Sequence, residues 1–156
     1  MAHLLIIEAR FYDDIADELL SGAVRSIERA GATYERVSVP GSFELPAALS
    51  MAMEAVAMGG KRYDGYVILG CVIRGETSHY DIVANESARG IMRLAVEETA
   101  AVGYGIVTVD NEDQARARAR ADGPNRGGQA AEAALRMVAV RAGFGLKAPS
   151  SAIGAD

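Results

Sequence analysis

The chain has 156 residues, of which 50% are hydrophobic and 24% charged, and its formal net charge is -5. This length and composition predict one globular domain over residues 1–146, and they exclude two domains of ordinary size. The acidic balance argues against a general nucleic-acid or anionic-membrane surface, so we expect a small-molecule substrate and neither nucleic acid nor membrane as a partner.

Cysteine usage and the first residues indicate the compartment. Cys71 is the only cysteine, so the chain has no intrachain disulfide and no cysteine spacing typical of a metal site. The apolar stretch at residues 3–8 is too short to span a bilayer and lacks the pattern of a signal peptide. We therefore predict a cytoplasmic protein, and we expect the tail at 147–156, which is rich in Gly, Pro, Ser and Ala, to be disordered.

Short apolar runs alternate along the chain with segments of helical periodicity. The runs predict buried strands at 4–7, 34–39, 66–73 and 106–109. The other segments predict helices at 13–30, 43–58, 80–101, about 112–121 and 126–142. This order predicts an α/β fold, a three-layer α/β/α sandwich with a four-stranded parallel, flavodoxin-like sheet and helices on both of its faces.

In such a sheet, ligands bind beyond the carboxyl ends of the strands. Phe11 follows the first strand, and an aromatic ring there can stack on a flat heterocycle, although ordinary loop packing is the alternative. After the second strand, Gly41 allows close approach of a ligand, and Ser42 can bond to a polar ring. Glu44 in the same segment equally suits helix capping.

The segment after the third strand is typical of an anion site. The chain turns at Gly75 and begins a helix near Ser78, which leaves unpaired amides at the positive end of the helix dipole. Phosphate is a natural occupant of such a site. His79 in the first turn is placed for proton transfer. The alternative is that Ser78 is only an N-cap and His79 an exposed first-turn residue.

Several separated segments together resemble the lumazine synthase family in their order and spacing: Phe11, 41–46, 70–79, 105–108 and 125–127. The resemblance implies a transferase of riboflavin biosynthesis. Such an enzyme condenses 5-amino-6-ribitylaminouracil with 3,4-dihydroxy-2-butanone 4-phosphate to give 6,7-dimethyl-8-ribityllumazine, phosphate and water. It implies no metal and no organic cofactor.

The resemblance also implies roles for individual residues. Phe11 would stack on the pyrimidine, Ser42 and Glu44 would hold the ribityl chain, and His79 would transfer protons. The remaining contacts to the pyrimidine substrate would come from Gly41, Phe43, Val72 and Ile73. The phosphate would be bound by the backbone amides of Gly75, Glu76 and Thr77.

A neighbouring subunit completes the site in this family. The resemblance implies that Tyr104 lies over the ring, that Arg118 binds the phosphate and that Arg126 lies near the pyrimidine oxygens. The spacing back from 125–127 selects Arg118, and Arg116 and Arg120 are expected on a solvated face. A shared site implies a homo-oligomer with a pentamer as its minimum unit, and the sequence leaves open whether pentamers pair or form a 60-subunit shell.

Two positions near the predicted site depart from the family pattern, as does the turn at 122–124 between the last two helices. Tyr12 stands where asparagine is common, and Glu76 places a carboxylate at the phosphate amides, which is tolerable only if it points to solvent or pairs with Arg74. The alternatives are a lumazine- or flavin-binding paralogue or shell protein with weak catalysis, and an archaeal-type riboflavin synthase. His79 and both phosphate elements favour the condensation. A flavodoxin would have a loop rich in glycine and hydroxyl residues at 10–13, which this chain lacks.

Overall fold

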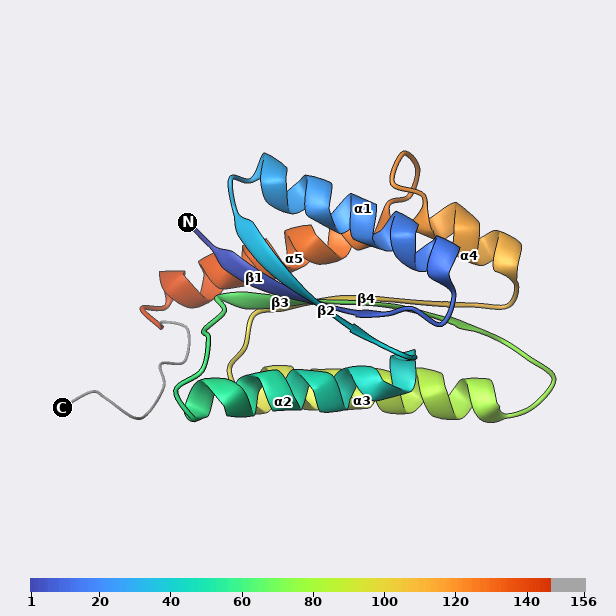
Figure 1. Ribbon diagram of the computed structural model, residues 1–156, viewed down its shortest axis with the longest axis horizontal. Coiled ribbons are helices and arrows are strands. Elements are labelled where there is room, and N and C mark those ends of the chain that lie inside the picture. Colours follow the sequence, from blue (N-terminus) through green and yellow to red (C-terminus); the bar gives the residue numbers. More distant parts are fainter. Residues whose placement is uncertain (147–156) are drawn as a thin grey trace.

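The computed structural model describes residues 1–146 and has a parallel sheet between two layers of helices (Figure 1). The strands are β1 (His3–Ala9), β2 (Thr33–Val39), β3 (Gly65–Ile73) and β4 (Val102–Val109), in the spatial order β2-β1-β3-β4. The helices are α1 (Asp13–Arg29), α2 (Leu45–Ala57), α3 (His79–Glu97), α4 (Glu112–Ala119) and α5 (Arg126–Gly143). The three-layer α/β/α fold expected from the sequence is confirmed. The tail expected to be disordered lies outside the described residues.

The core consists of two clusters, one on each face of the sheet. Leu4 and Ile6 of β1 belong to the cluster under α1 and α5, whereas Leu5 and Ile7 belong to the cluster under α2 and α3. Successive strand side chains point to opposite faces, and helices cover both faces here (Figure 1). This arrangement explains why the central strands are continuous apolar runs in the sequence.

Strand β2 was expected to be buried, and this expectation is wrong. All of its residues are half-buried or exposed, because β2 lies at a sheet edge and helices pack little against it, whereas the other edge strand, β4, is mostly buried under α5. Its apolar and β-branched residues resemble those of a central strand, but burial depends on the position in the sheet, which the pattern does not report.

The ends of other elements also differ from the predicted ones. Strand β4 begins at Val102, four residues earlier than expected, because Gly103 and Gly105, which are poor strand formers, are part of it. Helix α3 ends at Glu97, where Thr99 takes a φ of 50° and the Ala100 amide bonds to the Ala95 carbonyl. This is the geometry of a Schellman cap. The residue with positive φ in this motif is usually glycine, so a threonine at this position does not indicate the end of a helix in the sequence.

The segment before α2 is a 3-10 turn, η1 (Ser42–Glu44), so the helix begins at Leu45 and not at residue 43. Pro46 lies in the first turn of α2, where its missing N–H has no helical partner to lose. Helix α4 ends two residues earlier than expected. No helix within residues 1–146 is long and apolar enough to cross a membrane.

Candidate active site

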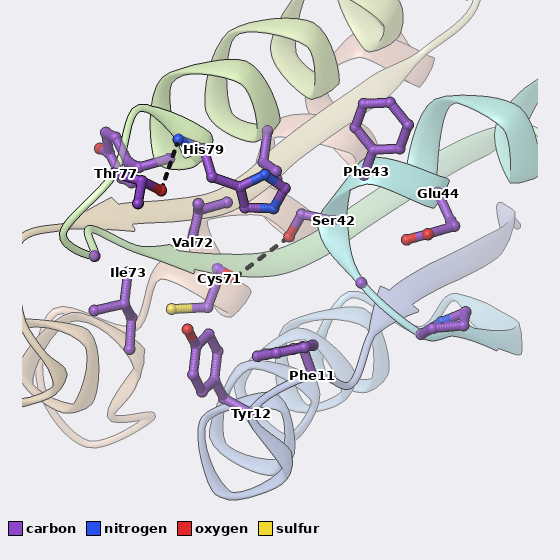
Figure 2. A pocket seen from close by; sticks show the side chains of 15 residues that line it. Phe11, Tyr12, Ser42, Phe43, Glu44, Cys71, Val72, Ile73, Thr77 and His79 are labelled. Atoms are coloured by element: carbon purple, nitrogen blue, oxygen red, sulfur yellow. Dashed lines mark hydrogen bonds between the residues drawn. The ribbon is translucent and has the colours of Figure 1, made fainter.

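A cavity of about 490 Å³ opens beyond the carboxyl ends of β1, β2 and β3. The predicted site residues that line it are Phe11, Gly41, Ser42, Phe43, Glu44, Val72, Ile73, Gly75, Thr77 and His79. Figure 2 shows these side chains converging on one space from three loops and from the end of β3. The structure therefore brings together residues that are far apart in the sequence, as expected for the carboxyl edge of a parallel sheet.

Phe11 provides a free aromatic face at the cavity. Its side chain is 73% exposed, although it belongs to a residue type that is usually buried. The ring contacts Tyr12 edge to face, with centroids 5.0 Å apart and planes at 76°. A ring with this much exposed surface has area available to stack on a planar ligand.

The η1 turn brings polar groups to the cavity beside β3. Ser42 is buried, and its hydroxyl donates to the Cys71 carbonyl over 3.5 Å (Figure 2). This close approach requires Gly70, because a Cβ there would lie 2.6 Å from the Ser42 Oγ. Glu44 is exposed and stands at the N-cap of α2, yet its side chain makes no capping hydrogen bond in the described structure. Capping therefore does not occupy this carboxylate.

The loop between β3 and α3 ends with His79 as the first helical residue. Ser78 stands at the N-cap position, but its side chain makes no capping bond, so the alternative in which Ser78 serves only to cap the helix is not supported. Instead, the Thr77 hydroxyl accepts a hydrogen bond from the His79 amide over 3.3 Å. The His79 side chain is exposed, and Figure 2 shows its imidazole directed into the cavity toward Ser42. An accessible imidazole in this position can exchange protons with a bound molecule.

Glu76 is exposed and does not line the cavity. Arg74 does not neutralise it, because its guanidinium pairs with Asp110 over 3.1 Å and with Asp81 over 3.8 Å and lies 4.2 Å from the Tyr80 ring centroid. The solvent-facing option for Glu76 thus holds, while the role of its backbone amide stays a prediction.

The residues expected from a neighbouring subunit lie together in a second cavity of about 420 Å³. Tyr104, Arg118 and Arg126 line it from β4, α4 and the start of α5. The Arg118 guanidinium donates to the Gln114 carbonyl over 3.3 Å, and Arg126 donates to the Gln129 side chain over 3.0 Å. Within one chain these residues therefore lie in a different cavity from His79.

The two other arginines near Arg118 have different surroundings. Arg116 pairs with Glu112 over 2.6 Å and with Asp14 over 3.7 Å, and Arg120 pairs with Asp122 over 3.3 Å. Neither lines the second cavity, and both are exposed. Arg116 and Arg120 thus lie on a solvated face, whereas the role of Arg118 in binding the phosphate stays a prediction.

Sequence reasoning did not predict Cys71 and Tyr80 as cavity residues, and it singled out Tyr12 only as a departure from the family pattern. Burial raises the pKa of Cys71 to about 12, so the group is a neutral thiol near pH 7. Burial also raises the pKa of Tyr12, which keeps this phenol protonated. The available signal was adjacency, since each of the three flanks a residue predicted to be in the site.

Residues 1–146 contain no group of three or more His, Cys, Asp or Glu side chains arranged to hold a metal ion. The first cavity offers an imidazole, a carboxylate, hydroxyls and backbone amides around an aromatic platform. These groups can bind a flat polar ring and an anionic group side by side, and the imidazole can transfer protons to and from the bound molecules.

Comparison with known proteins gives a consistent result. The family model described as 6,7-dimethyl-8-ribityllumazine synthase matches residues 1–142. The chain is 57% identical over 143 residues to 6,7-dimethyl-8-ribityllumazine synthase 1 of Rhizobium meliloti, covering 92% of this chain and 94% of that protein. It is 54% identical to the 6,7-dimethyl-8-ribityllumazine synthase of Agrobacterium fabrum, covering 92% and 97% of the two chains. The chain therefore belongs to the 6,7-dimethyl-8-ribityllumazine synthase family.

Proposed function

We propose that this protein condenses 5-amino-6-ribitylaminouracil with 3,4-dihydroxy-2-butanone 4-phosphate to form 6,7-dimethyl-8-ribityllumazine, phosphate and water. The observation that carries the proposal is the first cavity, which combines the exposed face of Phe11, the imidazole of His79 and the open turn at Gly75. The similarity to 6,7-dimethyl-8-ribityllumazine synthases over almost the whole chain supports the same reaction.

The reaction needs a sequence of proton transfers. The amine of one substrate attacks the ketone carbon of the other, and the carbinolamine loses water to become an imine. Loss of the proton on the neighbouring carbinol carbon then expels phosphate, which leaves with the electrons of its C–O bond, and the enol that forms tautomerises to a new carbonyl at that carbon. Attack of the second nitrogen on this new carbonyl closes the ring with loss of a second water. His79 can accept and return protons in several of these steps because its imidazole lies in the cavity.

Binding and orientation account for much of the acceleration. In this proposal Phe11 stacks on the pyrimidine, while Ser42 and Glu44 hold the ribityl chain. The amides at Gly75, Glu76 and Thr77 bind the phosphate together with Arg118, whose guanidinium suits a doubly charged oxyanion. Holding two reactive molecules side by side removes much of the entropic cost of their encounter.

We also propose that the site forms between subunits of a homo-oligomer, with a pentamer as the minimum unit. Arg118 and Tyr104 lie in the second cavity and His79 lies in the first, so one chain alone does not join them. Exposed apolar side chains on α2 and α3, among them Met51, Met92 and Val96, are 65–71% accessible and suit burial against a neighbour.

In this proposal residues 1–146 act as one catalytic domain in the cytoplasm, without a metal or an organic cofactor. The flavin-binding alternatives are not favoured, because riboflavin carries no phosphate and has no need of the Gly75 turn or of Arg118. The same argument favours the condensation over an archaeal-type riboflavin synthase, whose lumazine substrates carry no phosphate.

The test is a reaction with both substrates and purified full-length protein. Lumazine absorbance and phosphate release are followed together, and the spontaneous reaction is subtracted. We expect product and phosphate in a one-to-one ratio at a rate above the background. Tight binding of lumazine or riboflavin without acceleration would instead support a binding protein.

A further inference from the structure

A buried carboxylate lies directly behind the loop that carries Phe11. Glu8 on β1 is 1% exposed, and its Oε1 accepts a hydrogen bond from the Arg10 guanidinium. The other oxygen, Oε2, has no hydrogen-bond partner among the described residues, and the Arg36 Nε is 3.9 Å away. Burying a carboxylate is costly unless it is paired, so the contact with Arg10 offsets part of the cost of burying Glu8.

Arg10 is held by several groups at once. Its Nε donates to Asp13 over 3.0 Å, and its Nη2 donates to Asp17, both on α1. Its backbone amide donates to the Val39 carbonyl at the end of β2 over 3.1 Å. The Glu8 and Asp17 carboxylates raise the pKa of Arg10 further above its usual value, so the charge is permanent. A planar guanidinium that meets separate carboxylates has few other conformations available to it.

Phe11, the next residue, has little packing of its own. It is 73% exposed and contacts Tyr12 edge to face, so burial does not determine its position. Arg10 does not line the cavity, whereas Phe11 does. The Arg10 side chain is therefore bonded to β1 and α1, and the Arg10 amide is bonded to β2. Phe11 follows directly after this restrained residue and lines the cavity.

We infer that Arg10 is a positioning residue, which through Glu8, Asp13 and Asp17 holds Phe11 in the orientation that stacks on the pyrimidine substrate. The inference rests on the proposed function. The competing explanation is that Arg10 only stabilises the start of α1 and the buried Glu8. That role would change the stability of the protein but not its selective affinity for one substrate.

The first test is Arg10→Lys, which keeps the positive charge but loses the planar guanidinium that bonds to several carboxylates at once. We expect the KM for the pyrimidine to rise about fivefold, with the KM for the butanone phosphate within about twofold, because a loosened platform weakens one of the two substrates. The matched control is Arg116→Lys, since Arg116 also joins the first turn of α1, through Asp14, to a second carboxylate. We expect both KM values to stay unchanged in the control.

The second test asks whether Arg10 acts through Phe11. In a Phe11→Ala background, we expect the further change Arg10→Lys to alter the KM for the pyrimidine by less than about twofold, because the group being positioned is gone. A full additional effect in that background would overturn the inference. An equal rise of both KM values, no rise at all, or no effect of Phe11→Ala itself would also overturn it.

Folding is controlled with a milder variant. If Arg10→Lys does not fold, Asp13→Ala together with Asp17→Ala leaves the buried Glu8–Arg10 pair intact and removes both side-chain contacts to α1, so that only the 3.4 Å contact to the Asp13 carbonyl remains there. We expect a smaller rise of the same KM, and an unchanged value would contradict the inference. Failure of the proposed function is separate, since the unaltered protein would then form no product above the spontaneous rate.

Discussion

His79 is the residue in the first cavity best suited to proton transfer. It is the first residue of α3, it is exposed, and its imidazole points into the cavity. Its amide is bonded to the Thr77 hydroxyl, so the backbone at the start of the helix is fixed while the ring remains accessible. In the proposed function, His79 raises the rate of the chemical steps, whereas the affinity for the product should depend mainly on other groups.

We therefore expect His79→Ala to lower kcat about 100-fold, because a positioned general acid–base catalyst contributes on this order. The Kd of the lumazine product should change by less than about twofold, since the platform and the ribityl contacts remain. Steady-state kinetics and a fluorescence titration with the product measure the two quantities. A loss of product affinity as large as the loss of kcat would show that His79 binds ligand and does not mainly transfer protons.

Arg118 and Arg120 differ by two positions on one segment but have different surroundings. We expect Arg118→Ala to raise the KM for the phosphorylated ketone about tenfold or more, because a guanidinium–phosphate contact is lost. Arg120→Ala is the control, because Arg120 pairs with Asp122 outside the second cavity. If the Arg120 variant showed the rise and the Arg118 variant did not, the phosphate ligand would be misassigned.

At the scale of elements, the contact between β4 and α5 positions the second cavity. A Cβ on Gly103 would overlap the Ala130 carbonyl group, so the strand and the helix pack backbone to backbone. Ala130 also lines the second cavity with Tyr104 and Arg126. Gly103 made the start of β4 difficult to predict from the sequence, and the same residue allows α5 to approach the strand closely.

We expect Gly103→Ala to lower the free energy of unfolding by about 2–3 kcal/mol, because the added methyl group has no space. Gly143→Ala is the control, since a Cβ there meets nothing within 4 Å, and its effect should stay within about 1 kcal/mol. Denaturant unfolding at a matched protein concentration measures both. Equal effects of the two substitutions would contradict the close contact.

The opposite edge of the sheet is held by an ionic cluster that includes Glu35 of β2. Glu35 accepts from Lys61 over 2.5 Å and lies 3.0 Å from the His3 ring. These partners, Lys61 first and then His3, lower the pKa of Glu35 from 4.5 to about 2. The cluster joins β1, β2 and the segment before β3.

Because the pKa of Glu35 is lower in the folded state, its stabilising effect is complete above pH 4.5 and is lost as the pH falls toward 2. We expect Glu35→Gln to be less stable than the unaltered protein at pH 7, with a difference that shrinks over this range. Melting temperatures of both proteins across the range measure it. A difference that is constant with pH would show that the charge of Glu35 does not stabilise the fold.

At the scale of the whole molecule, the division of site residues between two cavities makes a prediction about mixed oligomers. A His79→Ala chain keeps an intact second cavity, and an Arg118→Ala chain keeps an intact first cavity. When the two variants are unfolded and refolded together in equal amounts, about a quarter of the interfaces in a closed ring should combine two intact halves.

At a ketone concentration below the KM of the Arg118→Ala variant, we expect this mixture to be more active than either variant alone, approaching about a quarter of the unaltered rate. The control is each variant refolded by itself, and light scattering checks that the assembly has the same mass in every sample. No recovery at an unchanged mass would show that both residues act within one chain.

Local patterns determined much of the fold and most of the first cavity. Alternating strands and helices define the three layers, because hydrophobic periodicity is a property of neighbouring residues. Phe11, Ser42 and His79 could be predicted because the carboxyl ends of parallel strands share one edge, so loops far apart in the sequence must meet there. The motifs in these loops also sufficed to indicate the family.

The tertiary structure alone decided the features that depend on what packs against a residue. Strand β2 is exposed because it lies at a sheet edge that helices cover little, and β4 extends through Gly103 by pairing with β3, with the missing side chain leaving room for α5. Thr77 and not Ser78 bonds to the start of α3 because the loop conformation sets which hydroxyl reaches the amide. The anchoring of Arg10 by Glu8 and Asp17 is likewise a contact between elements, and no local pattern encodes such a contact.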